Sequence, residues 1–158
     1  MAEIADRRPR SAAPVFSATW CHGAPGIALA RLGVFGHLGI GVYRAEAITA
    51  LETTCRAIEA NLRADTGNYS LCHGLAGNAD ILLYGSQVLG KGHEAYLKLL
   101  HQVATNGVRK HARGGKQWPC GTRGETPSLM LGLAGIGYSY LRVADCSLPS
   151  VLMLTSSS

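Results

Sequence analysis

The sequence lacks the long apolar runs that mark membrane-spanning and secreted chains. It contains no stretch of about 18 uncharged apolar residues, so no membrane span is predicted. The segment Met1 to Pro14 is polar and Arg-containing, without the apolar centre of a secretory signal. Aromatic residues make up only 6% of the chain and do not interleave with its basic cluster, which argues against a nucleic-acid partner.

Charged residues are also scarce. They account for 16% of the 158 residues, against 47% that are apolar, so much of the chain is expected to be buried in one domain. The net charge of +5 has one local concentration, residues 109–116, which we expect to be a solvated loop or helix end rather than a nucleic-acid site. Five cysteines, an odd number at uneven spacings, match no disulfide framework and indicate a reducing cytoplasm.

A repeated tripeptide stands out from this background. Cys-His-Gly occurs as Cys21-His22-Gly23 and again as Cys72-His73-Gly74, and each copy is followed three residues on by another glycine, Gly26 or Gly77. A third unit, 131–135, keeps the two glycines and lacks the Cys-His pair. The glycine pairs begin 51 and then 58 residues apart, a period typical of stacked supersecondary units.

The segments that follow the glycine pairs have helical periodicity. Each pair opens a stretch that is apolar nearly all round, which predicts buried inner helices over 27–38, 78–89 and 136–143. Longer amphipathic segments lie between them. The stripe of the first one comprises Ile48, Leu51, Cys55, Ile58 and Leu62. No run alternates as a strand does, so the sequence predicts an all-α fold in which outer amphipathic and inner apolar helices repeat.

The phased Cys-His-Gly units predict a zinc site. If the units pack side by side, their glycine loops converge at one end and bring Cys21, Cys72 and His73 together. Three protein ligands leave a fourth tetrahedral position open, as in catalytic zinc sites. Two thiolates and a neutral imidazole give formal zero charge, and these soft ligands suit a substrate thiol that loses its proton. The alternative is that both cysteines are buried hydrophobes and the histidines are hydrogen-bonded core residues.

The remaining cysteines and histidines have weaker claims to a site. His22 occupies in the first unit the place of His73 in the second, and it is our candidate catalytic residue; the roles of third ligand and outer-shell donor stay open for it. Cys120, in the run Trp118-Pro119-Cys120-Gly121, is a competing ligand without a neighbouring histidine. Cys55 lies on the helical stripe and is expected in the core.

The residues around the tripeptides resemble the two zinc motifs of the lanthionine synthetase C-like family. These residues are Trp20 to Gly26 and Ser70 to Asn78, and Pro127 to Tyr138 resembles the final repeat of the family. The tail, Leu148 to Leu152, is similar to the end of a bifunctional type II lanthipeptide synthetase. The likeness runs from about residue 20 to residue 154.

The resemblance implies a fold and an activity. The fold is an α/α toroid, an inner and an outer ring of helices, of which this chain would hold about three hairpin repeats. The activity is that of a zinc-dependent cyclase in which Cys21, Cys72 and His73 bind Zn²⁺ and the cysteine thiol of a dehydrated precursor peptide takes the vacant position. The thiol adds to dehydroalanine or dehydrobutyrine by Michael addition and forms lanthionine or methyllanthionine.

The chain departs from the family pattern before Trp20. Family members have further hairpins there, with an additional active-site His and Asp, and a bifunctional synthetase also has a dehydratase domain. We therefore expect residues 1–19 to be a polar, disordered segment and residues 20–158 to be the C-terminal portion of a truncated cyclase domain. Its apolar edge would be open to self-association or to a partner chain.

The sequence does not decide whether such a chain is itself an enzyme, because the upstream catalytic residues of the family are missing from it. Two alternatives to the cyclase stay open. One is a non-catalytic fragment that binds zinc or thiol peptides and needs a partner chain. The other is an enzyme of the same family that adds glutathione to dehydroamino acids.

Overall fold

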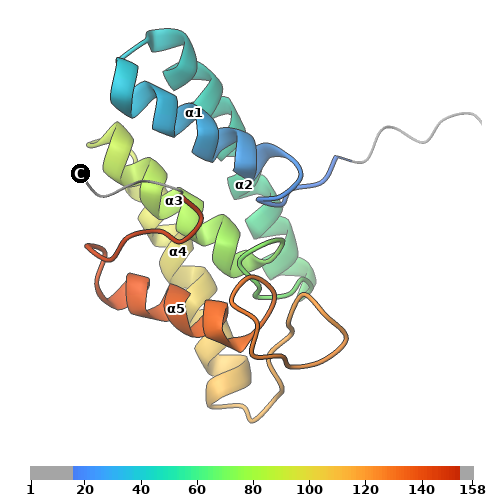
Figure 1. The fold of residues 1–158 in the computed structure, drawn as a ribbon. Helices are drawn as coiled ribbons and strands as arrows, with labels where there is room; N and C mark the ends of the chain where they lie inside the picture. The colour runs from blue at the N-terminus through green and yellow to red at the C-terminus, as the bar shows by residue number, and fades with distance from the viewer. Residues whose placement is uncertain (1–15, 154–158) are drawn as a thin grey trace, which may run out of the picture.

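The computed structural model describes residues 16–153, and every regular element within them is a helix (Figure 1). The helices are α1 (Ala24–Leu38), α2 (Gly41–Ala64), α3 (Leu75–Leu89), α4 (Glu94–Gly107), the π-helical turn η1 (Val108–Ala112) and α5 (Leu133–Ala144). This part of the chain has no strand beyond one isolated bridge between Ala18 and Gly23. The prediction of an all-α fold is confirmed.

Residues 1–15 lie outside the described residues, and most of the segment expected to be polar and disordered falls there. The division at residue 20 therefore stays a prediction. None of the helices from α1 to α5 is long and apolar enough to cross a bilayer.

Helix α3 lies at the centre of the arrangement and packs against α1, α2, α4 and α5 (Figure 1). Helices α1 and α2 form one hairpin, which turns at Gly39, where a φ of 66° is the left-handed conformation that glycine adopts without strain. Helices α3 and α4 form the second hairpin. Helix α5 is the inner helix of the third repeat, and it has no hairpin partner among the described residues.

The outer helices bury the stripes that the sequence predicts. Leu51 and Ile58 of α2 are fully buried, and Leu100 and Val103 of α4 are nearly so. Helix α3 is buried nearly all round, as expected of an inner helix. Burial of one such side chain contributes about 1.5–3 kcal/mol, so these contacts hold the outer helices against α3.

The second glycine of each repeat lets an inner helix lie directly on the loop that precedes it. A Cβ on any of these glycines would lie within 2.2 Å of the carbonyl oxygen six residues earlier, closer than side chains tolerate. The three glycines are Gly26, Gly77 and Gly135. The repeated glycine in the sequence is therefore explained by a close contact between helix and preceding loop, which all three repeats share.

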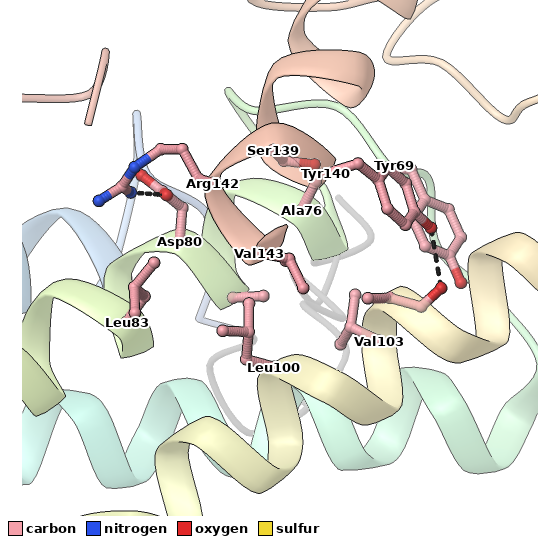
Figure 2. Close-up of a pocket in the computed structure, with 12 residues that line it drawn as sticks. Tyr69, Ala76, Asp80, Leu83, Leu100, Val103, Ser139, Tyr140, Arg142 and Val143 are labelled. Carbon is pink, nitrogen blue, oxygen red and sulfur yellow. Dashed lines mark hydrogen bonds and ion pairs between the residues drawn. The ribbon is translucent and has the colours of Figure 1, made fainter. Parts of the chain in front are cut away.

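A buried ion pair fixes the C-terminal segment to the centre of the fold. Arg142 of α5 and Asp80 of α3 face each other with 3% and 4% of their side chains exposed (Figure 2). Arg142 Nε also donates to the carbonyl of Leu148 at 2.9 Å, and Ser150 Oγ donates to the other carboxylate oxygen of Asp80. Burial lowers the pKa of the Arg142 guanidinium from its ordinary value. These contacts join α3, α5 and the tail.

Removal of this arginine should destabilise the protein strongly. We expect Arg142→Ala to lower the free energy of unfolding by about 3–5 kcal/mol, because it leaves the Asp80 carboxylate buried without a cation. The exposed Arg56→Ala should change it by about 0.5 kcal/mol or less. Urea unfolding of both variants measures the difference, and equal losses would show that the ion pair has no special role.

The side of the α1–α2 hairpin that faces away from α3 is open. Ile27 of α1 is 53% exposed, whereas Asn78, which holds the equivalent place in α3, is 4% exposed. A groove of about 700 Å³ lies along this side, lined among others by Phe16, Ile27 and Thr49. An apolar flank thus borders the first Cys-His-Gly loop.

Candidate metal centre

Each inner helix is preceded by a tight turn that begins with a hydroxyl residue. In the first repeat, the N–H of His22 donates to the carbonyl of Thr19 at 3.2 Å. In the second repeat, the N–H of Gly74 donates to the carbonyl of Ser70 at 3.1 Å. In the third, the N–H of Gly132 donates to Ser128 at 2.9 Å. The hydroxyl side chain supports the turn each time, and the first repeat has Thr19 in this place. The turns present the residues 21–22, 72–73 and 130–131 in equivalent positions.

Main-chain hydrogen bonds connect the three turns in a row. The N–H of Cys72 donates to the carbonyl of Met130 at 2.9 Å, and the N–H of Cys21 donates to the carbonyl of Cys72 at 3.4 Å. The main chain of Cys72 is therefore hydrogen-bonded to the turns on both sides of it, and that of Cys21 to one neighbouring turn. This row brings residues 51 positions apart in the sequence into contact.

A buried side chain adds a second tie to the first turn. Asn78 Nδ2 donates to the carbonyl of Ala18 at 2.9 Å, so α3 holds the segment that leads into Cys21. The first and third repeats have Ile27 and Ile136 at this place, where no such bond is made. The amide of the second repeat therefore fixes the first turn in a way that the other two repeats do not reproduce.

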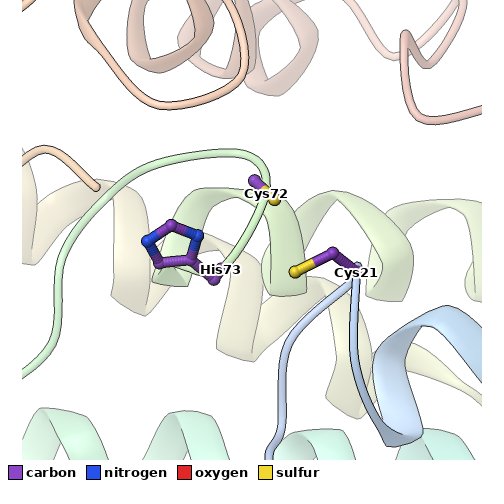
Figure 3. Close-up of side chains that lie close together, drawn as sticks. All are labelled: Cys21, Cys72 and His73. Carbon is purple, nitrogen blue, oxygen red and sulfur yellow. The ribbon is translucent and has the colours of Figure 1, made fainter. Parts of the chain in front are cut away.

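These contacts bring together the three predicted ligands. The Sγ atoms of Cys21 and Cys72 and a ring nitrogen of His73 all lie within 4.8 Å of one another. Figure 3 shows both sulfurs and one ring nitrogen turned toward a common space. Around a tetrahedral zinc with bonds of about 2.0–2.3 Å, ligand atoms lie roughly 3.3–3.8 Å apart. The ligand atoms thus lie no more than about 1.5 Å further apart than zinc requires, and the donor set suits zinc.

The surroundings of Cys72 favour its neutral thiol until a cation is bound. Burial, together with a hydrogen bond and charge from Cys21, raises the pKa of Cys72 to about 11. A divalent cation reverses this preference, because thiolates are the forms that bind metal. Two thiolates and one neutral imidazole would balance the charge of Zn²⁺.

The other candidates are not among these mutually close ligand atoms. His22 is exposed and lines the groove beside α1 and α2, and it does not belong to the group of mutually close ligand atoms. Cys120 is buried, and it does not belong to that group of ligand atoms within residues 16–153. Cys55 packs against the core, where burial first and then Glu59 raise its pKa to about 11. The expectation that Cys55 is a core residue is confirmed.

Sequence reasoning missed three residues that build the site. Met130 accepts the hydrogen bond that joins the second turn to the third. Its place was predictable, because it lies two residues before the first glycine of its repeat, as Cys21 and Cys72 do. Asn78 binds the first turn, which nothing in the sequence marked. Gly121 lies against the His73 ring. In the sequence, only its neighbour Cys120 is a candidate ligand.

A family model described as lanthionine synthetase C-like protein matches residues 3–153. The chain therefore belongs to the lanthionine synthetase C-like family. Membership indicates a function of the lanthionine-cyclase type, directed at peptide substrates. No curated protein matches the chain.

Metal binding at this cluster should depend steeply on pH. Each of the two thiols must lose its proton to bind, and the raised pKa of Cys72 leaves that thiol protonated at neutral pH. We expect Cys72 alone to make the affinity for Zn²⁺ rise by roughly tenfold per pH unit across neutral pH, with about one proton released from its thiol per ion. Competition with a chromophoric chelator at several pH values measures the slope, and an affinity that does not change with pH would exclude Cys72 as a thiolate ligand.

Proposed function

We propose that this chain carries the zinc site of a thioether-forming cyclase that makes lanthionine or methyllanthionine in peptides. The observation that carries the proposal is the convergence of Cys21, Cys72 and His73 from two separate loops, with their ligand atoms within 4.8 Å of one another. Membership of the lanthionine synthetase C-like family supports the same reaction class.

In this proposal Cys21, Cys72 and His73 are the protein ligands. When bound, zinc supplies a Lewis acid that lets a substrate thiol lose its proton at neutral pH and orients the sulfur. The third repeat supports the site without adding a ligand, because Met130 holds the place that cysteine has in the first two. One coordination position is then left for substrate.

Access for the peptide is open on the side of the first turn. Cys21 is exposed, and a cavity of about 350 Å³ beside it is lined by Trp20, Ile27 and Arg31 among others. A peptide segment that enters here can present a cysteine to the cluster. The apolar walls of the cavity can contact the side chains next to that cysteine. We place the protein in a reducing cytoplasm, which would keep its own thiols free to bind metal.

The reaction conserves mass. The substrate sulfur attacks the β-carbon of dehydroalanine or dehydrobutyrine, the π electrons move toward the carbonyl, and the α-carbon then takes up a proton. We assign the delivery of that proton to His22, which is exposed next to Cys21 in the same turn. Substrate would have to lie between the cluster and the neighbouring groove for this assignment to hold.

The finer identity follows the sequence likeness. We propose that residues 20–158 correspond to the C-terminal portion of a cyclase domain of the kind found in bifunctional type II lanthipeptide synthetases. The tail that carries this likeness is packed into the fold by Ser150 and Leu152, both of which are buried. Its substrate would be a dehydrated precursor peptide.

The open flank favours a second candidate function. The groove beside α1 and α2 and the exposed Ile27 suit a protein that binds zinc and thiol peptides but acts only with a partner chain or a second copy. Such a protein would retain the metal and would not catalyse the reaction alone.

Metal analysis of purified variants tests the ligand assignment. We expect about one zinc per chain in the wild type, and a loss of at least tenfold in affinity for Cys21→Ala and Cys72→Ala. The exposed Cys146→Ala is the matched control and should keep its zinc. Unchanged metal in both ligand variants would remove the site.

Incubation with a dehydrated cysteine peptide tests the chemistry. We expect the peptide mass to stay constant while its alkylatable thiol disappears, as thioether formation requires. His22→Gln should keep the metal and slow this loss by roughly 100-fold or more, the usual contribution of a positioned acid. Full zinc occupancy without any loss of thiol would contradict the cyclase and favour the second candidate.

A further inference from the structure

The loop 118–121 forms a wall beside the His73 ring. A Cβ built on Gly121 would lie 2.8 Å from both Cε1 and Nε2 of His73, closer than real Cβ atoms approach any heavy atom. The nitrogen on the side of the sulfurs is Nδ1, next to the carbon that attaches the ring (Figure 3). The Cε1–Nε2 edge therefore lies against Gly121 while Nδ1 faces the two cysteines.

Main-chain hydrogen bonds hold the loop side of this contact in place. The N–H of Gly121 donates to the carbonyl of Leu131 at 2.7 Å, and the carbonyl of Pro119 accepts from Tyr69 at 2.7 Å. Tyr69 directly precedes the turn of the second repeat, and Leu131 belongs to the turn of the third. The same row of turns that positions Cys72 thus holds the wall in place.

We propose that Gly121 is a positioning residue of the metal site, whose missing side chain leaves the slot that orients His73 with Nδ1 toward the sulfurs. This inference rests on the proposed zinc site. Gly121 does not have a positive φ, so its backbone conformation does not require glycine. Glycine is required here because the His73 ring occupies the place that a Cβ would take.

The size of the conflict is large for a metal site. An ordinary contact begins at 3.4 Å, so a methyl group at position 121 would push the ring edge by about 0.6 Å. Binding sites require their groups within about 0.5 Å of the productive geometry. The ring is the end of a side chain, so it moves before the bonded backbone does, and Nδ1 moves with it.

The test compares Gly121→Ala with Gly124→Ala, a glycine three residues further along the chain whose Cβ would meet nothing within 4 Å. Metal-depleted proteins are titrated with Co²⁺, which reports thiolate ligands by its absorption, and with Zn²⁺ against a chelator. We expect Gly121→Ala to lose ten- to hundredfold in affinity and to change the cobalt spectrum. Gly124→Ala should stay within twofold. Wild-type affinity and spectrum in Gly121→Ala would overturn the proposal.

Leu131 offers the competing explanation, because its Cδ2 would lie 3.0 Å from the same Cβ. The background Leu131→Ala separates the two. A persistent loss of affinity on adding Gly121→Ala supports the contact with His73, and full recovery overturns it. If Gly121→Ala does not fold, recovery of folding by His73→Ala supports the contact, and continued misfolding counts against it.

A measurement on metal-free protein can test the role of Gly121 even if the proposed zinc site is wrong. If wild-type protein binds neither metal through Cys72, the zinc proposal fails. The ring resonances of His73 in metal-free protein then decide the role of Gly121. A shift in Gly121→Ala but not in Gly124→Ala supports the contact, and unchanged resonances in both overturn it.

Discussion

The structure depends on the row of main-chain hydrogen bonds that joins the three turns before the inner helices. The bonds from Cys72 to Met130 and from Cys21 to Cys72 place equivalent residues of successive repeats side by side. Helix packing alone brings the helices together, but these bonds set the relative register of the loops at their ends. A site made of residues from two repeats exists only because this register is fixed.

The third repeat shows how one local structure serves two purposes. Its turn has a hydroxyl residue and glycines at the same places as the others, yet it presents Met130 and Leu131 where the second repeat presents Cys72 and His73. It contributes a carbonyl to the row and a backbone acceptor to the wall beside His73. Repetition thus supplies the scaffold, and substitution within it decides which turns carry chemistry.

Much of this arrangement was predictable from the sequence because it depends on periodicity. The glycine pairs, the stripe through Leu51 and Ile58 and the phase of the Cys-His-Gly units indicated an all-α fold with converging loops. The contacts of Asn78 and Gly121 were not predictable, since they depend on which loops become neighbours in space. Whether His22 acts in the reaction could not be deduced either, because its position relative to a peptide depends on how the peptide binds.

The one-sided bonding of the first turn has a thermodynamic consequence. Cys72 is anchored from both neighbours, whereas Cys21 has a single main-chain bond of 3.4 Å and belongs to the outermost turn of the row. An ion bound by both loops would act as a cross-link between residues 16–23 and the central helix α3. Occupancy and the docking of residues 16–23 are then linked equilibria, so each strengthens the other by the same factor.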